Sequence, residues 1–311
     1  MPLPPEYLRY PRRRAGMDHE RYAWSPVVDR PPILWPGGAR VAVWIVACLQ
    51  WFPLDTRDLP LLPLGIERDS YPDLRSYTHR DYGNRVGVFR VMNVTKRFGV
   101  RATAAVNAAV CRRYPAVIEE GKRLGWEFIA HGLHMGCVHH AGLSAEEEAA
   151  ILDESLATVR LASGQPVAGW LSPGQSQSLR TLDLLAERGV EFVCDWVNDD
   201  LPYLLNAPPR GLYAMPYPHE LSDATIIWQN RHSPTEFVEQ VRDQFDWLYR
   251  EAERCGGRIF GLAVHPWIIG QPHRIRSLAE ALTYILGHER IWPATASEIL
   301  AAFRSQQGEG K

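Results

Sequence analysis

The 311-residue sequence lacks several features that would assign it to a common class of protein. It contains neither G-x-G-x-x-G nor G-K-[ST], which disfavours chemistry on dinucleotides and nucleoside triphosphates. Its formal net charge is only −2, so bulk electrostatics does not indicate binding to nucleic acid or to an anionic membrane. No stretch approaches the roughly 18–20 apolar residues that cross a membrane. We therefore expect a globular protein with neither a nucleic-acid nor a membrane partner.

A disulfide framework is also disfavoured. The five cysteines are odd in number and include no C-x-x-C pair, which fits a reducing compartment better than an oxidising one. The first residues, Met-Pro-Leu-Pro-Pro-Glu-Tyr, show no basic segment followed by an apolar core, so we expect no secretory leader. The expected location is the cytoplasm.

Proline and arginine are concentrated in residues 1–38, which we interpret as an N-terminal arm. Proline removes backbone donors and blocks regular structure, so the arm is expected to lie over the body or over a neighbouring subunit. The arm is too poor in apolar residues to form a core, and Leu34 and Trp35 need a surface to cover them. We therefore expect a homo-oligomer, a dimer or a tetramer, in which residues 39–311 form the catalytic domain.

Apolar β-branched runs alternate with amphipathic segments through residues 39–311, which predicts a parallel sheet in a barrel or a doubly wound layer. A long Pro-rich loop is predicted after Pro53, to about residue 82. The predicted strands are 40–47, 100–106, 126–130, 167–171, 191–194 and 258–264, with further strands at 211–215 and 224–228. The predicted helices are 86–98, 114–124, 144–162, 179–188, 234–255, 275–286 and one that begins at Thr295.

Polar side chains stand where the predicted strands end. His131 follows the strand 126–130 and opens a loop with three more histidines, His265 follows 258–264, and Asp195 follows 191–194. In a barrel such strand ends converge at one mouth, where imidazoles and carboxylates can bind a metal or act directly as acid and base. The simpler alternatives are a His-rich surface loop, a hydrogen-bonded core histidine at 265, and turn capping by Asp195 and Asp199.

Several motifs at these positions resemble one known family. They are Tyr82–Arg90 (YGNRVGVFR), His131-Gly132, Gly169-Trp170 before Ser172-Pro173, Cys194-Asp195-Trp196 with the segment 198–203 (NDDLPY), and His265–Arg274 (HPWIIGQPHR). The chain is similar to the NodB-homology polysaccharide deacetylase superfamily over roughly residues 30–303. Within that superfamily it most resembles the branch of bacterial allantoinase and cyclic imide hydrolase proteins.

This resemblance implies an α/β fold, a distorted (β/α) barrel with about seven parallel strands, and hydrolysis of C–N amide bonds. The chain departs from the family at the metal site. Gln50 stands where the family carries a carboxylate, and an amide cannot ionise. Met135 stands where metal-binding deacetylases carry a second histidine, with His134 one residue early. The cofactor is therefore expected to be either none or a divalent metal such as zinc, held by His131 and His139.

The predicted catalytic residues are His131, which binds water or a metal, His265, which transfers a proton or orients substrate, and Asp195 as their carboxylate partner. The residues expected to contact the substrate are Gln50, Trp51, Trp170, Ser172, Gln175, Trp196, Asp199 and Trp267. The predicted activity is hydrolysis of a small cyclic or linear amide, imide or ureide, for which both a metal-free and a metal-dependent mechanism remain open. The alternatives are a catalytically degenerate member that binds a small ligand, and a metal-dependent N-deacetylase of an acetylated sugar.

Overall fold

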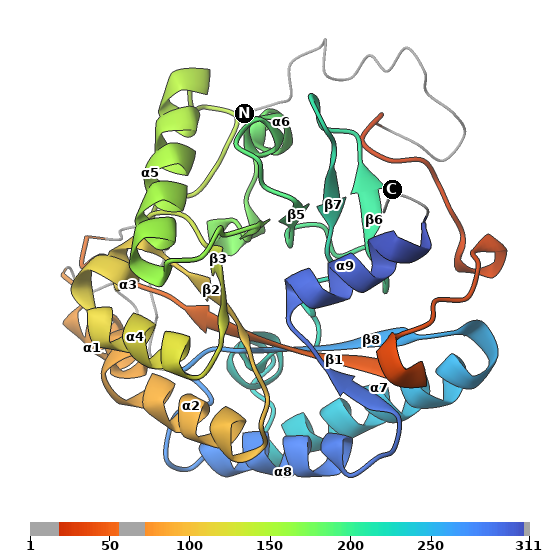
Figure 1. Cartoon of the computed structure of the whole chain (residues 1–311). Helices are drawn as coiled ribbons and strands as arrows, with labels where there is room; N and C mark the ends of the chain where they lie inside the picture. The colour runs from red at the N-terminus through yellow and green to blue at the C-terminus, as the bar shows by residue number, and fades with distance from the viewer. Residues whose placement is uncertain (1–18, 56–71, 308–311) are drawn as a thin grey trace.

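The apolar runs form one curled sheet in the computed structural model, which describes residues 19–55 and 72–307 (Figure 1). The strand order is β6-β7-β5-β4-β3-β2-β1-β8, and β9 pairs with the start of β1. All pairs are parallel except β6 with β7. The strands are β1 (Val41–Leu49), β2 (Thr103–Val106), β3 (Glu127–Ala130), β4 (Gly169–Trp170), β5 (Phe192–Val193), β6 (Tyr203–Leu205), β7 (Leu212–Ala214), β8 (Arg258–Val264) and β9 (Ile291–Pro293).

The helices cover the outer face of this sheet, and the short helix α9 lies against its inner side (Figure 1). They are α1 (Leu74–Tyr82), α2 (Val88–Arg97), α3 (Ala108–Arg113), α4 (Pro115–Arg123), α5 (Ala145–Ser163), α6 (Thr181–Glu187), α7 (Pro234–Cys255), α8 (Ile275–Leu286) and α9 (Ala296–Gln306). Among the described residues, no helix is both long and apolar enough to cross a membrane.

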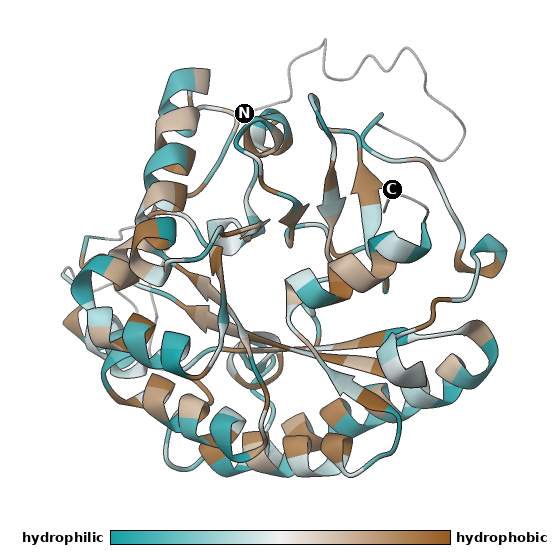
Figure 2. Ribbon diagram, viewed as in Figure 1, coloured by the Kyte–Doolittle hydropathy of each residue, from teal (hydrophilic) through white to brown (hydrophobic). Residues whose placement is uncertain are grey.

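Strand β1 is the centre of the molecule, and all nine of its residues are buried. Val43 and Ile45 belong to the core between sheet and helices, whereas Trp44 and Cys48 belong to the core on the inner face. Both cores are apolar because successive side chains of a strand point to opposite faces. Hydropathy follows the same division, with brown strands in the interior and teal helix faces toward solvent (Figure 2).

The predicted fold class is confirmed: the parallel, curled sheet surrounded by helices is a polysaccharide deacetylase-like (β/α) barrel. Capping boxes at Ser144 and Thr295 open α5 and α9, where the sequence predicted helices to begin. Three short elements, α3, β6 and β9, have no counterpart in the prediction. Their brevity explains this, since a run of three to six residues carries little periodicity.

Two predictions of secondary structure are wrong. The segment predicted as the strand 224–228 is a π-helix, Ala224–Gln229, because the Ser222 hydroxyl accepts a hydrogen bond from the Thr225 backbone N–H at 3.0 Å and starts a helical turn. The loop predicted to reach residue 82 ends earlier, because Asp73 accepts from the Ser76 N–H at 2.9 Å and begins α1. The rest of that loop, residues 56–71, lies outside the described residues.

The described part of the arm, residues 19–38, lies on its own domain. The Trp35 indole is buried and donates to the Arg258 carbonyl at 2.9 Å. Arg21 forms an ion pair with Asp183, and its Nη2 also donates to the Leu179 carbonyl at 2.8 Å. The expectation that a surface covers Trp35 is therefore met within the chain, whereas Leu34 remains exposed.

Glycines in the 82–90 motif allow a close contact with the loop that follows β8. A Cβ at Gly87 would lie 2.0 Å from the Pro266 carbonyl oxygen, and a Cβ at Gly83 would lie 2.7 Å from the Trp267 backbone nitrogen. No real Cβ contact is that short, so only glycine permits the π-helical turn Gly83–Gly87 to pack here. The contact fixes the position of the segment directly after His265.

Candidate active site

Asn107 joins the carboxyl ends of three neighbouring strands. Its backbone N–H donates to the Leu49 carbonyl at 3.1 Å, and its side-chain oxygen accepts from the Trp51 N–H at 2.8 Å. Its side-chain amide also donates to the His131 carbonyl. Asn84, on the π-helical turn, donates to the Gln50 carbonyl at 2.8 Å. These bonds hold Gln50 and His131 beside each other at the end of the sheet.

The protonation state of His131 is determined by its two neighbours. Its Nδ1 lies 2.7 Å from the Leu171 carbonyl oxygen, which can only accept, so Nδ1 carries the proton. Burial is the main cause that lowers the pKa of His131 to about 4, so Nε2 is an unprotonated acceptor at neutral pH. Gln50 Nε2 lies 3.2 Å from this nitrogen and must be the donor. The Gln50 oxygen correspondingly accepts from the Trp267 indole N–H at 3.5 Å.

His265 is held by Asp223, which is fully buried. The carboxylate lies 2.7 Å from His265 Nδ1 and accepts from the backbone N–H groups of His265 at 2.9 Å and Ile269 at 3.1 Å. The β1–β8 register pairs Ala47 with Val264, so Cys48 and His265 are adjacent on the inner face. Burial lowers the pKa of His265, but Cys48 and Asp223 raise it more strongly, to about 10.

The two histidines therefore hold opposite protonation states at neutral pH. His131 is neutral and accepts at Nε2, whereas His265 is an imidazolium whose Nδ1 is bound by Asp223. They lie close enough that the charge of His265 also lowers the pKa of His131. Two titratable groups with widely separated pKa values form an acid–base pair.

Asp195 does not contact either histidine, so the predicted partnership is wrong in this respect and Asp223 takes that position. The Asp195 carboxylate accepts from the Ser172 N–H at 2.7 Å, from the Ser172 hydroxyl at 2.6 Å and from Gln177 Nε2 at 2.7 Å. Burial is the main cause that raises its pKa to about 6. Because Leu171 precedes Ser172 and holds His131, Asp195 positions the segment that orients that histidine.

The predicted substrate-contacting tryptophans divide between the mouth and the framework. Trp170 is buried and donates to the Ser172 hydroxyl at 2.8 Å, and Trp196 donates to Gln177 at 2.9 Å, so both support the Asp195 network. Trp267 reaches Gln50, and the Arg113 guanidinium lies 4.1 Å from the centre of the Trp51 ring. The Gln175 side-chain oxygen accepts from His219 Nδ1 at 2.7 Å, and the Gln175 Nε2 is buried without a partner.

The donor set does not fit a deacetylase-type metal. Gln50 Nε2 donates to the one nitrogen of His131 with a free lone pair, where a metal would have to bind. Met135 occupies the position of the second histidine, and His134 packs its ring against Trp51 at 5.7 Å. Within residues 19–55 and 72–307, no group of three His, Cys, Asp or Glu side chains is placed to hold an ion.

His139 belongs to a different buried cluster. Its Nδ1 lies 3.1 Å from Glu148 on α5, whose carboxylate also accepts from the hydroxyls of Ser178 and Thr181, both at 2.5 Å. Burial opposes ionisation of Glu148, yet His139 and the two hydroxyls lower its pKa. The structure thus ties the loop after His131 to α5 through His139, rather than placing this residue beside His131 as a second ligand.

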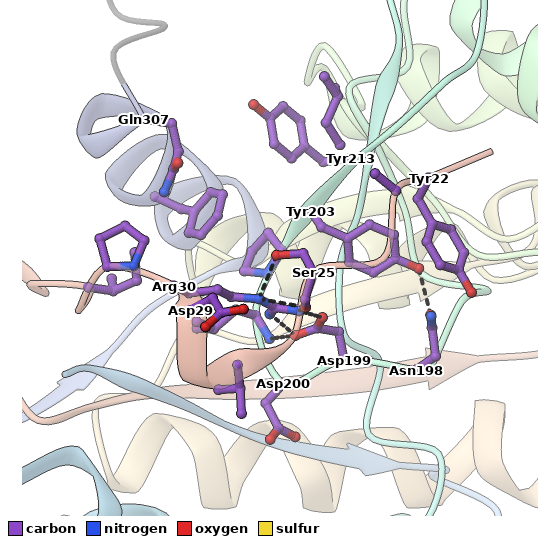
Figure 3. A pocket seen from close by; sticks show the side chains of 18 of the residues that line it. Tyr22, Ser25, Asp29, Arg30, Asn198, Asp199, Asp200, Tyr203, Tyr213 and Gln307 are labelled. Carbon is purple, nitrogen blue, oxygen red and sulfur yellow. Dashed lines mark hydrogen bonds and ion pairs between the residues drawn. The ribbon is translucent and has the colours of Figure 1, made fainter. Parts of the chain in front are cut away.

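Asp199 lies in a separate hollow between the arm and the segment before β6 (Figure 3). The hollow has a volume of about 940 Å³. Both carboxylate oxygens of Asp199 accept from Arg30, at 2.7 and 2.6 Å, and one also accepts from the Leu201 N–H. The predicted substrate contact of Asp199 is therefore replaced by an ion pair that fastens the arm, and the structure shows no bond from it to His131 or His265.

Three polar residues that organise the site were not predicted: Asp223, Asn107 and Asn84. Asp223 precedes a segment rich in β-branched residues, which pointed to a strand rather than to a turn. Asn107 follows β2 directly, and the strand-end rule that identified His131 and His265 would have identified it too. Asn84 lies inside the 82–90 motif, where sequence periodicity says nothing about its partner.

Comparison with known proteins finds polysaccharide deacetylase relatives and solved structures of the same fold. No family model matches the chain. A putative polysaccharide deacetylase of Schizosaccharomyces pombe is 25% identical over 242 residues, which cover 73% of this chain and 75% of the relative. The peptidoglycan deacetylase of Helicobacter pylori is 22% identical over 255 residues, which cover 71% of this chain and 85% of that protein.

The chain is similar to members of the NodB-homology polysaccharide deacetylase superfamily. Among solved structures, it is similar to the PuuE allantoinase, with a TM-score of 0.78 and 24% identity, over 89% of this chain and 94% of that one. This structure, under 25% identical, shows that the two proteins share a fold. Both the expected superfamily and the expected likeness to the allantoinase branch are confirmed.

Proposed function

We propose that the protein hydrolyses a carbon–nitrogen bond of a small cyclic amide, imide or ureide without a metal. The protein is a hydrolase of C–N amide bonds, the class to which its relatives belong. The observation that supports the metal-free form is the pairing of neutral His131 with protonated His265 beside Gln50, whose amide occupies the free lone pair of His131. Asp223 and the Leu171 carbonyl maintain the two protonation states.

In the proposed reaction His131 accepts a proton from water at Nε2 as the water oxygen attacks the carbonyl carbon. His265 then donates its Nε2 proton to the leaving nitrogen as the C–N bond breaks, and the products are a carboxylate and an amide or amine. A low pKa makes His131 a weak base. The positive charge of His265 therefore contributes most, because it stabilises the negative charge that develops in the transition state.

Gln50 has a defined part in this scheme. When the substrate carbonyl displaces its bond to His131, the Gln50 amide N–H is free to donate to the carbonyl oxygen, and His131 Nε2 is free to accept from water. The Trp267 indole holds the Gln50 oxygen at 3.5 Å and so keeps the N–H side of the amide toward His131. A glutamine at this position thus supplies a donor where the family's carboxylate would supply a metal ligand.

The proposed substrate class predicts the outcome of a direct screen. Purified protein is expected to open dihydropyrimidine, hydantoin, succinimide or allantoin rings, measured by loss of ring absorbance and appearance of the acid by mass spectrometry. Treatment with EDTA should leave the rate unchanged, since no described donor set fits a metal. Turnover of acetylated oligosaccharides alone, abolished by EDTA, would instead support the metal-dependent N-deacetylase.

We also propose a cytoplasmic homo-oligomer, dimer or tetramer. Five free cysteines support a reducing compartment. Trp24 and Val28 on the arm are 75% and 85% exposed, and exposed apolar groups of this size often mark contacts. Replacing both with serine is expected to lower the mass in multi-angle light scattering. The matched change Leu161→Ser, at an 88% exposed site on α5, should not alter it, and a monomeric wild type would refute the proposal.

A further inference from the structure

Arg80 and Arg274, close to the site, form no ion pair with any carboxylate of the described residues. Arg80 lies on α1 and Arg274 caps the N-terminal end of α8, and the Nε of each is buried without a hydrogen-bond partner. Both residues are partly exposed. A buried N–H without an acceptor loses hydration that nothing replaces.

Arg80 borders an aromatic wall that leads to the catalytic centre, and Arg274 lies close enough to His79 on this wall to lower its pKa. The Arg80 guanidinium lies 4.0 Å from the centre of the Phe52 ring, and Phe52 lies 6.4 Å from Trp267. His79, next to Arg80, lies 5.5 Å from Trp267 and 5.4 Å from Trp228. Trp267 in turn lies 6.5 Å from the His265 ring and donates to Gln50.

The charges around this wall are mostly positive. Burial, Arg274, Arg80 and Arg75 lower the pKa of His79 in that order, and burial is the main cause that lowers the pKa of Arg274 and Arg80. The acidic groups in reach are already used. Asp223 binds His265, and Asp73 binds Ser76 at the start of α1. A bound anion would remove the electrostatic penalty that the clustered cations now carry.

We propose that Arg80 and Arg274 form an anion subsite beside the His131–His265 centre, and that the amide hydrolysed there carries a carboxylate. This inference rests on the proposed function and specifies its substrate class. A planar carboxylate matches the fork of a guanidinium, and the indoles of Trp228 and Trp267 wall the path to the scissile bond. The arginines would thereby orient the substrate so that its amide carbon meets the water held by His131.

Binding can be tested without turnover, with succinate as the probe in calorimetry at constant ionic strength. Arg274→Gln and Arg80→Gln are each expected to raise the Kd for succinate at least tenfold, and Arg274→Lys should recover part of the loss. The matched control is Arg276→Gln, because Arg276 lies two residues further on, is exposed and pairs with Glu280. Equal succinate affinity in all four proteins, or tighter binding of inorganic phosphate than of succinate, would overturn the proposal.

Turnover supplies the second test, with hydantoin and hydantoin-5-acetate, which differ by one carboxymethyl group. We expect kcat/KM to favour the charged ring at least tenfold in the wild type, and this ratio to fall at least tenfold in Arg274→Gln. A ratio that stays constant in the variants would refute the subsite. If neither ring is hydrolysed but succinate binding still depends on both arginines, the subsite stands and the proposed ring substrates fail.

Discussion

His265→Ala and His131→Ala are each expected to lower kcat by about 10²-fold or more, the usual scale for loss of a general acid or base. His265→Ala removes the proton donor that the buried carboxylate of Asp223 holds in place. His131→Ala removes the Nε2 acceptor beside Gln50. Steady-state kinetics on the preferred ring substrate checks both. Asp223 keeps two backbone donors in His265→Ala, so circular dichroism should still show a folded domain.

The control for these variants is His140→Ala, in the same loop as His131 but exposed, which should have almost no effect.

Asp223→Asn separates positioning from packing, because asparagine keeps the shape but not the charge. The alkaline limb of kcat should then move from near pH 10 toward the ordinary histidine pKa of about 6.5. Asp153→Asn, which changes an exposed carboxylate paired with Arg188, should leave the limb in place. Equal small losses for all three histidines would locate the chemistry elsewhere.

Gln50→Glu should lower kcat by about 10²-fold, because it replaces a donor to the substrate carbonyl with a group that is negative at neutral pH. Loss of one such donor typically costs 10²–10³-fold. The new carboxylate would also favour the protonated form of His131 and so remove the base. Kinetics with and without added zinc measures the effect, and Gln177→Glu, which alters an amide that binds Asp195 instead, distinguishes it from a general response to charge.

The opposite result would identify a different kind of protein. If the wild type binds a ring ligand without turnover and Gln50→Glu with zinc gains activity, the chain is a degenerate member whose metal site can be rebuilt. Stoichiometric zinc in the wild type, lost in His131→Ala, would show that His131 gives up its bond to Gln50 and ligates a metal. Either finding contradicts the metal-free scheme.

The parts of the site that the sequence predicted share one physical cause. His131 and His265 each follow a buried, mostly apolar strand, and a parallel sheet brings such ends to one edge, so their proximity follows from the pattern alone. Gln50 was recognised for the same reason at the end of β1. The fold class followed from the same alternation of buried strands and amphipathic helices.

The partners of these histidines could not be predicted in the same way. Asp223 reaches His265 across a separation of 42 residues, and no periodicity in the chain records that contact. Asp195 had the better sequence argument, since it ends a strand, but its carboxylate is satisfied by Ser172 and Gln177 instead. The arginine subsite was missed because Arg80 lies on a helix that was predicted to be loop.

The central position of β1 has a consequence for how the chain folds as it is synthesised. β1 can pair with β2 early, but its other edge waits for β8, more than 200 residues later. The N-terminal arm also cannot dock until later segments are synthesised, since Trp35 bonds to Arg258 and Arg30 pairs with Asp199. An emerging chain therefore carries an exposed apolar strand edge through most of translation, a state prone to aggregation. Because of this strand order, we expect expression of the protein to depend on chaperones until β8 has left the ribosome.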